Sequence, residues 1–175
     1  MHNNFVTQVT SVDQRLSELG IVLPGLAAPV ANYVPAVRTG NYVYTSGQLP
    51  FVDGKLPVTG KVGVGTSKPD RYYSVEPLVD PEVAAGLAKQ SALNALAAVK
   101  ALVGSLDKVV RVIKVVGFVA SDPAFTGQPA VINGASNVLG EIFGERGVHA
   151  RSAVGVSVLP LDSPVEVELI LEVSD

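Results

Sequence analysis

A predicted helix from Asp80 to about Gly104 constrains the fold more than any other feature of the chain. Asp80 can cap its start, Pro81 suits the first helical position, and Glu82 places an acid near the positive end of the helix dipole. One face of this helix carries mostly small residues, namely Ala84, Ala88, Ser91, Ala95, Val99 and Leu102. Such a face can approach a flat neighbour closely, so we expect the helix to pack against a β-sheet.

The strands of that sheet are predicted on both sides of the helix. Residues 33–50 indicate two strands about a turn at 39–41, and the β-branched run 109–120 indicates a central strand. Helical spacing returns over 129–145, and we interpret 149–171 as a closing antiparallel hairpin. This order of elements predicts an α+β fold, in which two long helices cover one face of a mixed sheet.

Two other segments are interpreted from local signals. Residues 11–20 are predicted as a short helix, because Ser11 can cap its start and Gly20 suits its end. Residues 52–80 are rich in glycine, proline and polar side chains, and are predicted to form an extended or mobile surface loop. The glycines of this loop match neither a Walker A run nor a dinucleotide-binding fingerprint.

The low charge of the chain bears on its partners. Hydrophobic residues make up 47% and charged residues 17%, below the roughly 25% charged residues of ordinary soluble domains. Because no window reaches the ~18 continuous apolar residues of a membrane-spanning helix, we expect the apolar surplus to be buried between subunits. The net charge of −3 and the scattered lysines and arginines disfavour a nucleic-acid partner.

The residue types also limit the chemistry. The chain contains no cysteine, which excludes disulfides, thiolate metal sites and cysteine nucleophiles. His2 and His149 are the only histidines, so a zinc site would need carboxylates to complete it, and structural or surface roles are expected for both. The N-terminus lacks the basic and apolar regions of a signal peptide, so a cytoplasmic location is expected.

An arginine opens the first strand of the predicted closing hairpin. Strand alternation places Arg151 on one face with Ala153 and Gly155, opposite a predicted core face of Ser152, Val154, Val156 and Val158. The small neighbours leave room above the sheet, where a guanidinium could bind a carboxylate through two parallel hydrogen bonds. The alternative is a surface arginine that is paired with an acid.

The predicted hairpin also relates this arginine to an acid of the second strand. With the turn at 162–163, Glu166 lies opposite Ser157, and Arg151 lies opposite about Glu172. At ~3.3 Å per residue, Arg151 and Glu166 are then ~20 Å apart. They are therefore either unrelated or brought together by the packing of two subunits.

Two motifs in one order resemble the RidA family, also called YjgF or L-PSP. They are "NYVPAVRTGNYVYTSGQLP" and, after a helix and a strand, "ARSAVGVSVLPLDSPVEVELIL", and the resemblance covers about 30–173. It implies a chorismate-mutase-like fold over a single domain (1–175), a homotrimer, and a site in each cleft between subunits. Residues 1–29 are an N-terminal extension relative to the founding members, and the loop 52–80 is longer than theirs.

The resemblance implies hydrolysis of reactive enamines and imines, such as 2-aminoacrylate and its imine tautomer, to 2-keto acids and ammonia, with no metal or organic cofactor. Arg151 is similar to the arginine that binds the substrate carboxylate, and Glu166 to the acid associated with the hydrolytic water. The residues similar to other cleft positions are Tyr33, Ser46, Gly47 and Ala153, the last in place of a cysteine.

Two other functions are open on the same residues. A non-catalytic trimer could bind small carboxylates or a protein partner in its clefts, using Arg151 but no water-activating acid. Ribonuclease activity, attributed to some family members, is disfavoured by the acidic net charge. Glu168 shares the strand face of Glu166 and is expected to be structural.

Overall fold

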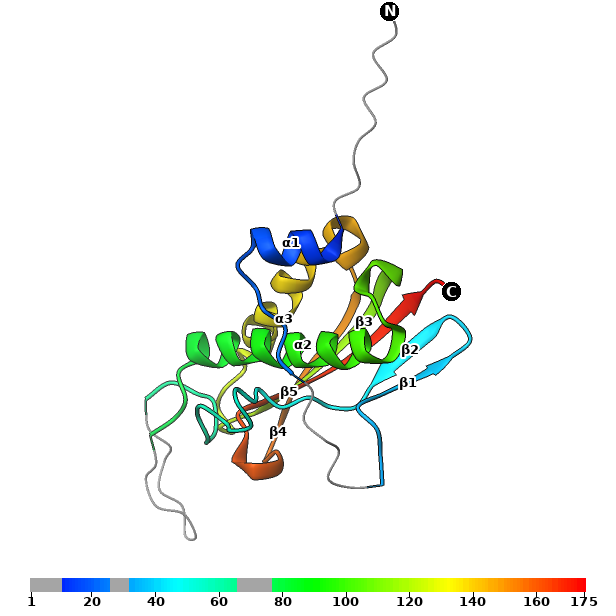
Figure 1. Cartoon of the computed structure of the whole chain (residues 1–175). Coiled ribbons are helices and arrows are strands. Elements are labelled where there is room, and N and C mark those ends of the chain that lie inside the picture. Colours follow the sequence, from blue (N-terminus) through cyan, green and yellow to red (C-terminus); the bar gives the residue numbers. More distant parts are fainter. Residues whose placement is uncertain (1–10, 26–31, 66–76) are drawn as a thin grey trace, which may run out of the picture.

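The computed structural model describes residues 11–25, 32–65 and 77–175 (Figure 1). His2 and the central part of the predicted long loop lie outside these ranges. The helices and strands are α1 (Val12–Glu18), β1 (Ala36–Thr39), β2 (Tyr42–Thr45), α2 (Pro81–Val103), β3 (Val109–Ala120), α3 (Gln128–Phe143), β4 (Ala150–Val156) and β5 (Val165–Val173). Three short 3₁₀ helices are η1 (Leu106–Lys108), η2 (Gly144–Gly147) and η3 (Pro160–Asp162).

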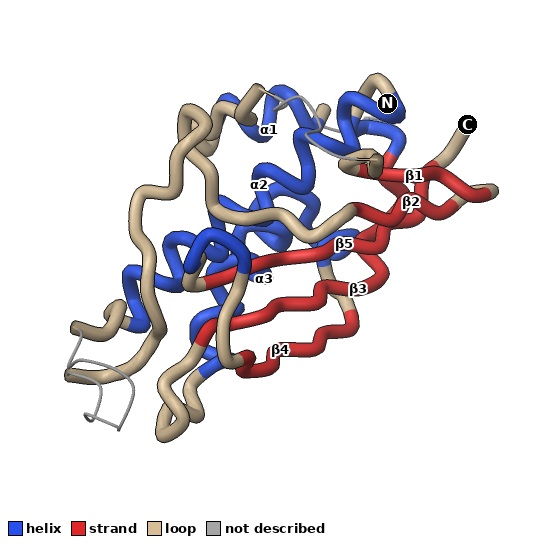
Figure 2. Tube along the Cα trace, turned by 90° about the horizontal axis from the view of Figure 1, so that it is seen from below, coloured by secondary structure: helices blue, strands red, loops and turns tan. Residues whose placement is uncertain are grey.

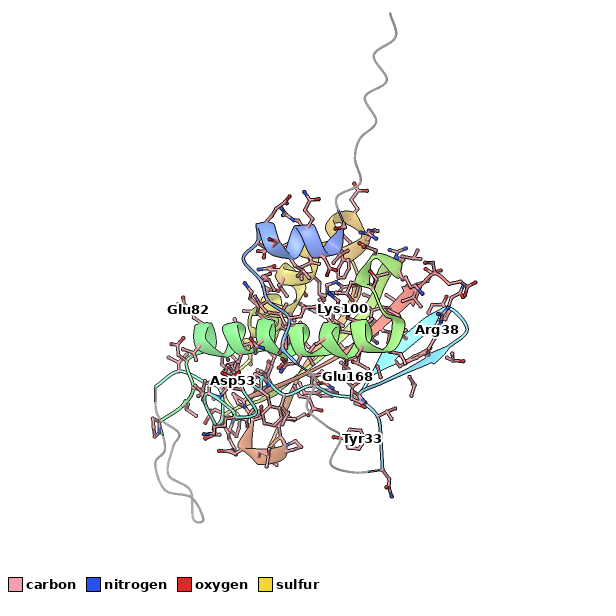
Figure 3. All side chains as sticks on the ribbon, in the orientation of Figure 1. Tyr33, Arg38, Asp53, Glu82, Lys100 and Glu168 are labelled. Carbon is pink, nitrogen blue, oxygen red and sulfur yellow. The ribbon has the colours of Figure 1, made fainter. Side chains whose placement is uncertain are left out.

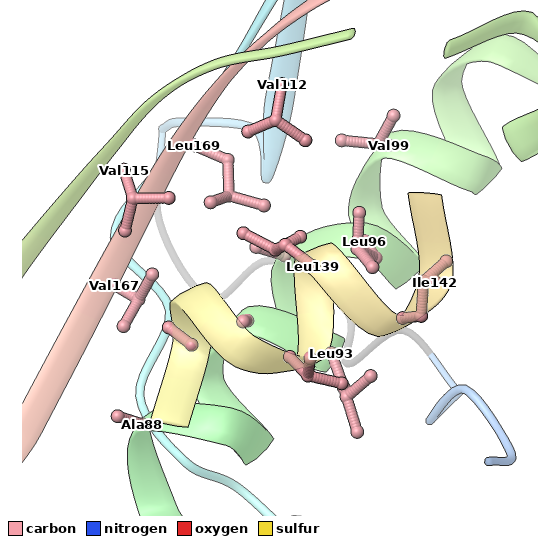
Figure 4. Packing of buried hydrophobic residues seen from close by; sticks show 14 of the residues in the cluster. Ala88, Leu93, Leu96, Val99, Val112, Val115, Leu139, Ile142, Val167 and Leu169 are labelled. Carbon is pink, nitrogen blue, oxygen red and sulfur yellow. The ribbon is translucent and has the colours of Figure 1, made fainter. Parts of the chain in front are cut away.

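The five strands form one mixed sheet in the order β1-β2-β5-β3-β4 (Figure 2). The β3–β4 pair is parallel and the other pairs are antiparallel. The two long helices cover one face of this sheet, and their buried side chains form one core with those of the strands (Figure 4). The predicted α+β fold is confirmed. We call the sheet face away from the helices the open face.

Helix α2 begins and ends at the predicted signals. The Asp80 carboxylate accepts a hydrogen bond from the Glu82 N–H at 2.8 Å, and Gly104 follows the last turn with a φ of 88°. The predicted small face is buried except for Leu102, which is 44% exposed, while Val103 is buried. Although α2 is apolar, no helix in the described ranges is long and apolar enough to cross a membrane.

Helices α2 and α3 are in close contact at Gly134. A Cβ atom built on Gly134 would overlap the backbone carbonyl oxygen of Ala85. A glycine is therefore required here by the close approach of the two helix backbones, and not by an unusual φ. The same approach lets α3 reach over the sheet, where Ile132 covers Gly117 of β3.

The predicted closing hairpin is wrong, because β4 and β5 do not pair with each other. Strand β3 lies between them: Val115 pairs with Arg151 on one side and with Leu169 on the other. Helix α3 connects β3 to β4, and a helical crossover of this kind joins parallel neighbours. The link 157–164 then crosses the end of β3, with Leu161 and Asp162 in the left-handed region.

The predicted core face of β4 is also reversed. Ser152 and Val154 pair with Val116 and Phe118 on the open face, and Val154 is 45% exposed. Ala153 instead packs against the core below α3. Alternation placed the residues of β4 in two sets correctly, but the valine-rich set does not face the helices of its own chain.

Segments outside the sheet add to the core. The predicted helix 11–20 is confirmed as α1, capped by the Ser11 hydroxyl, and its Val12 and Leu16 are buried. The ends of the predicted surface loop are hydrogen-bonded to the sheet, since Val62 is fully buried and bridges both Val79 and Ser121. At Val62 the backbone is therefore extended, as one of the two predicted alternatives has it, but the residue is buried and does not belong to a surface loop.

Candidate functional site

The six predicted site residues lie in two groups on opposite faces of the sheet. Ser46, Gly47 and Glu166 meet on the open face, and Tyr33 lies on the segment that leads to β1. Arg151 and Ala153 lie on the helix-covered side of β4, at the sheet edge. Each group is described separately below.

A β-bulge brings Gly47 onto Glu166. Tyr44 pairs with Ile170 and Gln48 with Val167, so four steps along one strand match three along the other. The extra residue bends the chain, as bulges near functional sites often do. A Cβ atom on Gly47 would overlap the Glu166 carboxylate, so only glycine leaves this carboxylate its observed position.

Ser46 is held in place by the segment before β1. Its hydroxyl donates to the Val34 carbonyl at 2.7 Å, and its N–H donates to the Pro35 carbonyl at 2.8 Å. The hydroxyl oxygen keeps its capacity to accept a hydrogen bond from a ligand. Tyr33 is adjacent and 58% exposed, with its ring outside the strands (Figure 3).

The surroundings of Glu166 perturb its acidity. Burial raises the pKa of Glu166 above its ordinary value, and the negative charge of Glu168 raises it further. Glu168, which Figure 3 labels, is two residues along β5 from Glu166, and strand alternation places both on the same face. The structural role expected for Glu168 therefore includes an electrostatic effect on its neighbour. An acid tuned in this direction is suited to proton transfer near neutral pH.

Arg151 is anchored on α3 by one of its terminal nitrogens. Its Nη1 donates to Asn133 Oδ1 at 2.8 Å and to Ser136 Oγ at 3.1 Å. Within the described ranges no carboxylate pairs with Arg151, and its Nε and Nη2 have no hydrogen-bond partner. The structural ion pair considered from the sequence is therefore absent from this part of the chain.

Sequence reasoning missed three residues around this arginine. Asn133 and Ser136 are one turn apart on α3, and His149 bonds Ser136 through Nε2 at 3.0 Å and the Gly147 carbonyl through Nδ1 at 2.6 Å. The available signals were the i, i+3 spacing on the helix and the position of His149 two residues before Arg151. We call Asn133, Ser136, His149 and Arg151 the arginine cluster.

Arg151 and Glu166 cannot hold one small molecule within a single chain. Their partners on β3, Val115 and Phe118, are three residues apart, and Arg151 and Glu166 lie on the two strands that flank β3. The two residues are therefore displaced by ~10 Å along the strands and by ~10 Å across the sheet. Their side chains also point to opposite faces of the sheet. The distance predicted from a hairpin was wrong, but the two alternatives drawn from the sequence still stand: Arg151 and Glu166 are either unrelated or brought together by the packing of two subunits.

The room expected above Ala153 and Gly155 is filled. Ala153 packs against the core, and a Cβ atom on Gly155 would lie 2.8 Å from Nε2 of Gln128 on α3. Any ligand at Arg151 must therefore approach from the outer edge of β4. In the described ranges, no three His, Cys, Asp or Glu side chains come close enough to hold a metal ion.

Comparison with known proteins shows similarity over nearly the whole chain. Residues 13–173 match the family described as "YjgF/chorismate mutase-like, putative endoribonuclease". Protein TCP17 of Trypanosoma cruzi is 39% identical over 165 residues, which cover 94% of this chain and 95% of that protein. The crystal structure of Atu1372 from Agrobacterium tumefaciens is 46% identical, covering 93% and 92% of the two chains, with a TM-score of 0.79. TdcF of E. coli, solved with bound serine, is 28% identical, covering 86% and 93%, with a TM-score of 0.52.

Proposed function

Because this chain belongs to the YjgF/chorismate mutase-like family, we propose that it hydrolyses reactive 2-imino acids and their 2-aminoacrylate tautomers to 2-keto acids and ammonia. The observation that carries the proposal is the state of Arg151, whose guanidinium is anchored at Nη1 and has no partner at Nε and Nη2 in the described ranges. TdcF, solved with bound serine, adds support because serine is also a small acid with nitrogen on the carbon next to its carboxylate.

The geometry of Arg151 suits a carboxylate. With both hydrogens of Nη1 used, the remaining donors are Nε–H and the two hydrogens of Nη2. Nε and Nη2 lie along one edge of the planar guanidinium, which matches the two oxygens of a carboxylate. An anchored arginine loses little side-chain entropy when it binds, so this edge is a preorganised anion site.

Glu166 and Ser46 supply the groups that the hydrolysis needs. Glu166 takes a proton from water as the water oxygen bonds to C2 of the imine, and it passes this proton to the imine nitrogen. In the resulting carbinolamine the C2 hydroxyl gives up its proton to the nitrogen as the C–N bond breaks, which leaves the ketone and ammonia. The Ser46 hydroxyl already donates to Val34, so its role is to accept an N–H of the substrate nitrogen.

The proposed site is shared between subunits of a homotrimer. Arg151 and Glu166 point to opposite faces of one sheet, so the arginine of one copy must meet the glutamate of another. The open face carries large exposed apolar side chains that a second copy would cover, including Val37 (51%), Tyr44 (41%) and Val154 (45%). In this arrangement a second subunit would bury the valine-rich face of β4, which the sequence predicted to be a core face.

The same cleft also allows a second function, the binding of small carboxylates or of a protein partner without turnover. The unpartnered Nε and Nη2 of Arg151 favour carboxylate binding whether or not a reaction follows. Endoribonuclease activity, which the family description names, is not proposed. The open face carries Glu166, Glu168 and Glu172 along β5, and these acids would repel a phosphate backbone.

The wild-type protein is expected to accelerate keto-acid release from enzymatically generated 2-iminopropanoate, and the Glu166→Gln variant is expected to lower kcat/KM by roughly 10²-fold.

The Glu166→Gln variant should also be more stable than the wild type at pH 7. Since the raised pKa means that the folded state holds this proton more tightly than the unfolded chain, the free energy of unfolding falls as pH rises above the ordinary value of 4.5. Because a glutamine side chain does not titrate, the variant does not undergo this fall in the free energy of unfolding.

The stability effect is checked by measuring the melting temperatures of Glu166→Gln and wild type as a function of pH. The two curves should converge at about pH 4.5 and below. Glu141→Gln, an exposed change on α3, is the matched control and should alter neither quantity. Equal kcat/KM in Glu166→Gln and wild type would contradict the role of Glu166. A wild type that binds pyruvate but accelerates no imine hydrolysis would favour the non-catalytic function.

A further inference from the structure

We infer that His149 and Ser136 are positioning residues, which orient the Arg151 guanidinium through a directed chain of hydrogen bonds. The inference deepens the proposed function and rests on it for the identity of the ligand. It assigns a role to a histidine for which the sequence indicated only a structural or surface position. The chain runs from the Gly147 carbonyl through His149 and Ser136 to Arg151.

The direction of each hydrogen bond follows from the groups involved. The Gly147 carbonyl can only accept, so the 2.6 Å contact requires a hydrogen on Nδ1 of His149, which selects the Nδ1–H tautomer of the uncharged ring. Nε2 then carries a lone pair, and the Ser136 hydroxyl donates to it at 3.0 Å. The oxygen of that hydroxyl is thereby turned so that it accepts from Arg151 Nη1 at 3.1 Å.

The guanidinium plane is set because Nη1 has a second partner. Asn133 Oδ1 accepts its other hydrogen at 2.8 Å, and Asn133 and Ser136 are fixed one turn apart on the same helix. A planar group with both hydrogens of one nitrogen bonded to two acceptors on the same helix has less freedom to rotate than one with a single bond. The Nε and Nη2 edge is therefore presented in one direction for a ligand carboxylate.

The location of the arginine cluster strengthens the hydrogen bonds that position Arg151. Ser136 and His149 are half-buried between α3 and the edge strand β4. Hydrogen bonds at such sites compete less with water and are stronger than exposed ones. Ser136 is not the nucleophile of a Ser–His pair here, because its oxygen already accepts a hydrogen bond from a cation, which lowers its nucleophilicity.

The first test needs no ligand. Nitrogen-15 NMR of the whole protein should show the neutral ring of His149 protonated at Nδ1, and Ser136→Ala should shift and broaden the Arg151 Nε–H signal. Ser136→Thr, which keeps the hydroxyl, should restore that signal, and Asn137→Ala, an exposed change next to Ser136, should leave it unchanged. A ring protonated at Nε2, or an Arg151 signal unaffected by Ser136→Ala, would overturn the inference.

The second test measures function. Ser136→Ala is expected to weaken pyruvate binding in calorimetry by about fivefold to tenfold, the effect of one hydrogen bond, and to raise KM by a similar factor with a smaller change in kcat. In an Arg151→Ala background the same change should have no further effect, because Ser136 acts through the arginine. An equal loss in both backgrounds would indicate a merely structural role and would overturn the inference.

The two proposals can fail separately. Suppose that the wild type hydrolyses no imine, but that Ser136→Ala alters the Arg151 signal and weakens pyruvate binding in the wild-type background and not in the Arg151→Ala background. The proposed activity is then wrong and the positioning role stands. If imine hydrolysis is confirmed and the His149 ring is protonated at Nε2, the activity stands and the positioning role is wrong.

Discussion

Arg151→Ala is expected to lower kcat/KM for 2-iminopropanoate by roughly 10²- to 10⁴-fold while leaving the melting temperature nearly unchanged. A hydrogen bond to a charged group contributes about 1.5–3 kcal/mol, and the Nε and Nη2 edge would make two of them to the substrate carboxylate. The structural loss is small because Arg151 bonds two half-exposed or exposed side chains of α3 and pairs with no carboxylate in the described ranges. Arg151→Lys should recover only part of the activity, since an ammonium cannot bind a carboxylate in the same two-point manner.

Mixed trimers make this prediction specific to a shared site. Arg151→Ala and Glu166→Gln subunits are each expected to be nearly inactive alone. After unfolding and refolding together in equal amounts, every mixed trimer would contain one cleft with both native residues, which restores about one quarter of the wild-type activity. No recovery on mixing, with trimers present in light scattering, would contradict a site that joins Arg151 of one subunit to Glu166 of another.

Gly134→Ala is expected to have the largest effect on stability, lowering the free energy of unfolding by about 1–3 kcal/mol. The added Cβ would overlap the backbone carbonyl of Ala85, which cannot rotate away as a side chain would. Helices α2 and α3 must therefore separate, and the contacts of α3 with the sheet loosen. Urea denaturation followed by circular dichroism measures the effect, which should also appear as a melting temperature lower by roughly 5–10 °C.

Gly140→Ala is the matched control on the same helix. A Cβ atom on Gly140 meets nothing within 4 Å, so the change should stabilise the protein by about 0.5–1 kcal/mol through the better helix propensity of alanine. Opposite signs for the two substitutions would separate the close approach at Gly134 from a general effect of alanine in α3. Similar destabilisation by both would show that the contact with Ala85 is not the cause.

The elements that local signals define were predicted well. Helix α2 has the predicted aspartate cap, the proline start and the glycine end. The first two strands and their turn also lie where the pattern placed them. These features depend on residues within about four positions of one another, so their physical cause is contained in a short stretch of sequence.

Strand pairing was predicted less well, because alternation does not say which neighbour a strand has. Strands β4 and β5 are close in sequence, and a hairpin is the simplest connection between them. The crossover through α3 instead places β4 beside β3, and β5 inserts on the other side of β3. This pairing also decided the surroundings of Arg151, because α3 covers the face of β4 that the pattern predicted either to face solvent or to line a cleft.

By itself, the sequence determined the fold class, the helix ends and the acidic face of β5, and through the family resemblance it singled out Arg151 and Glu166 as candidate site residues. Only the tertiary structure decided that Gly47 lies on the Glu166 carboxylate, that Arg151 is anchored by Asn133 and Ser136, and that His149 belongs to the same cluster. The physical reason is that helix caps and strand alternation are local, whereas these contacts join residues of separate elements. Their positions depend on how α3 packs across the sheet, and this packing is determined by the contacts of the whole core together.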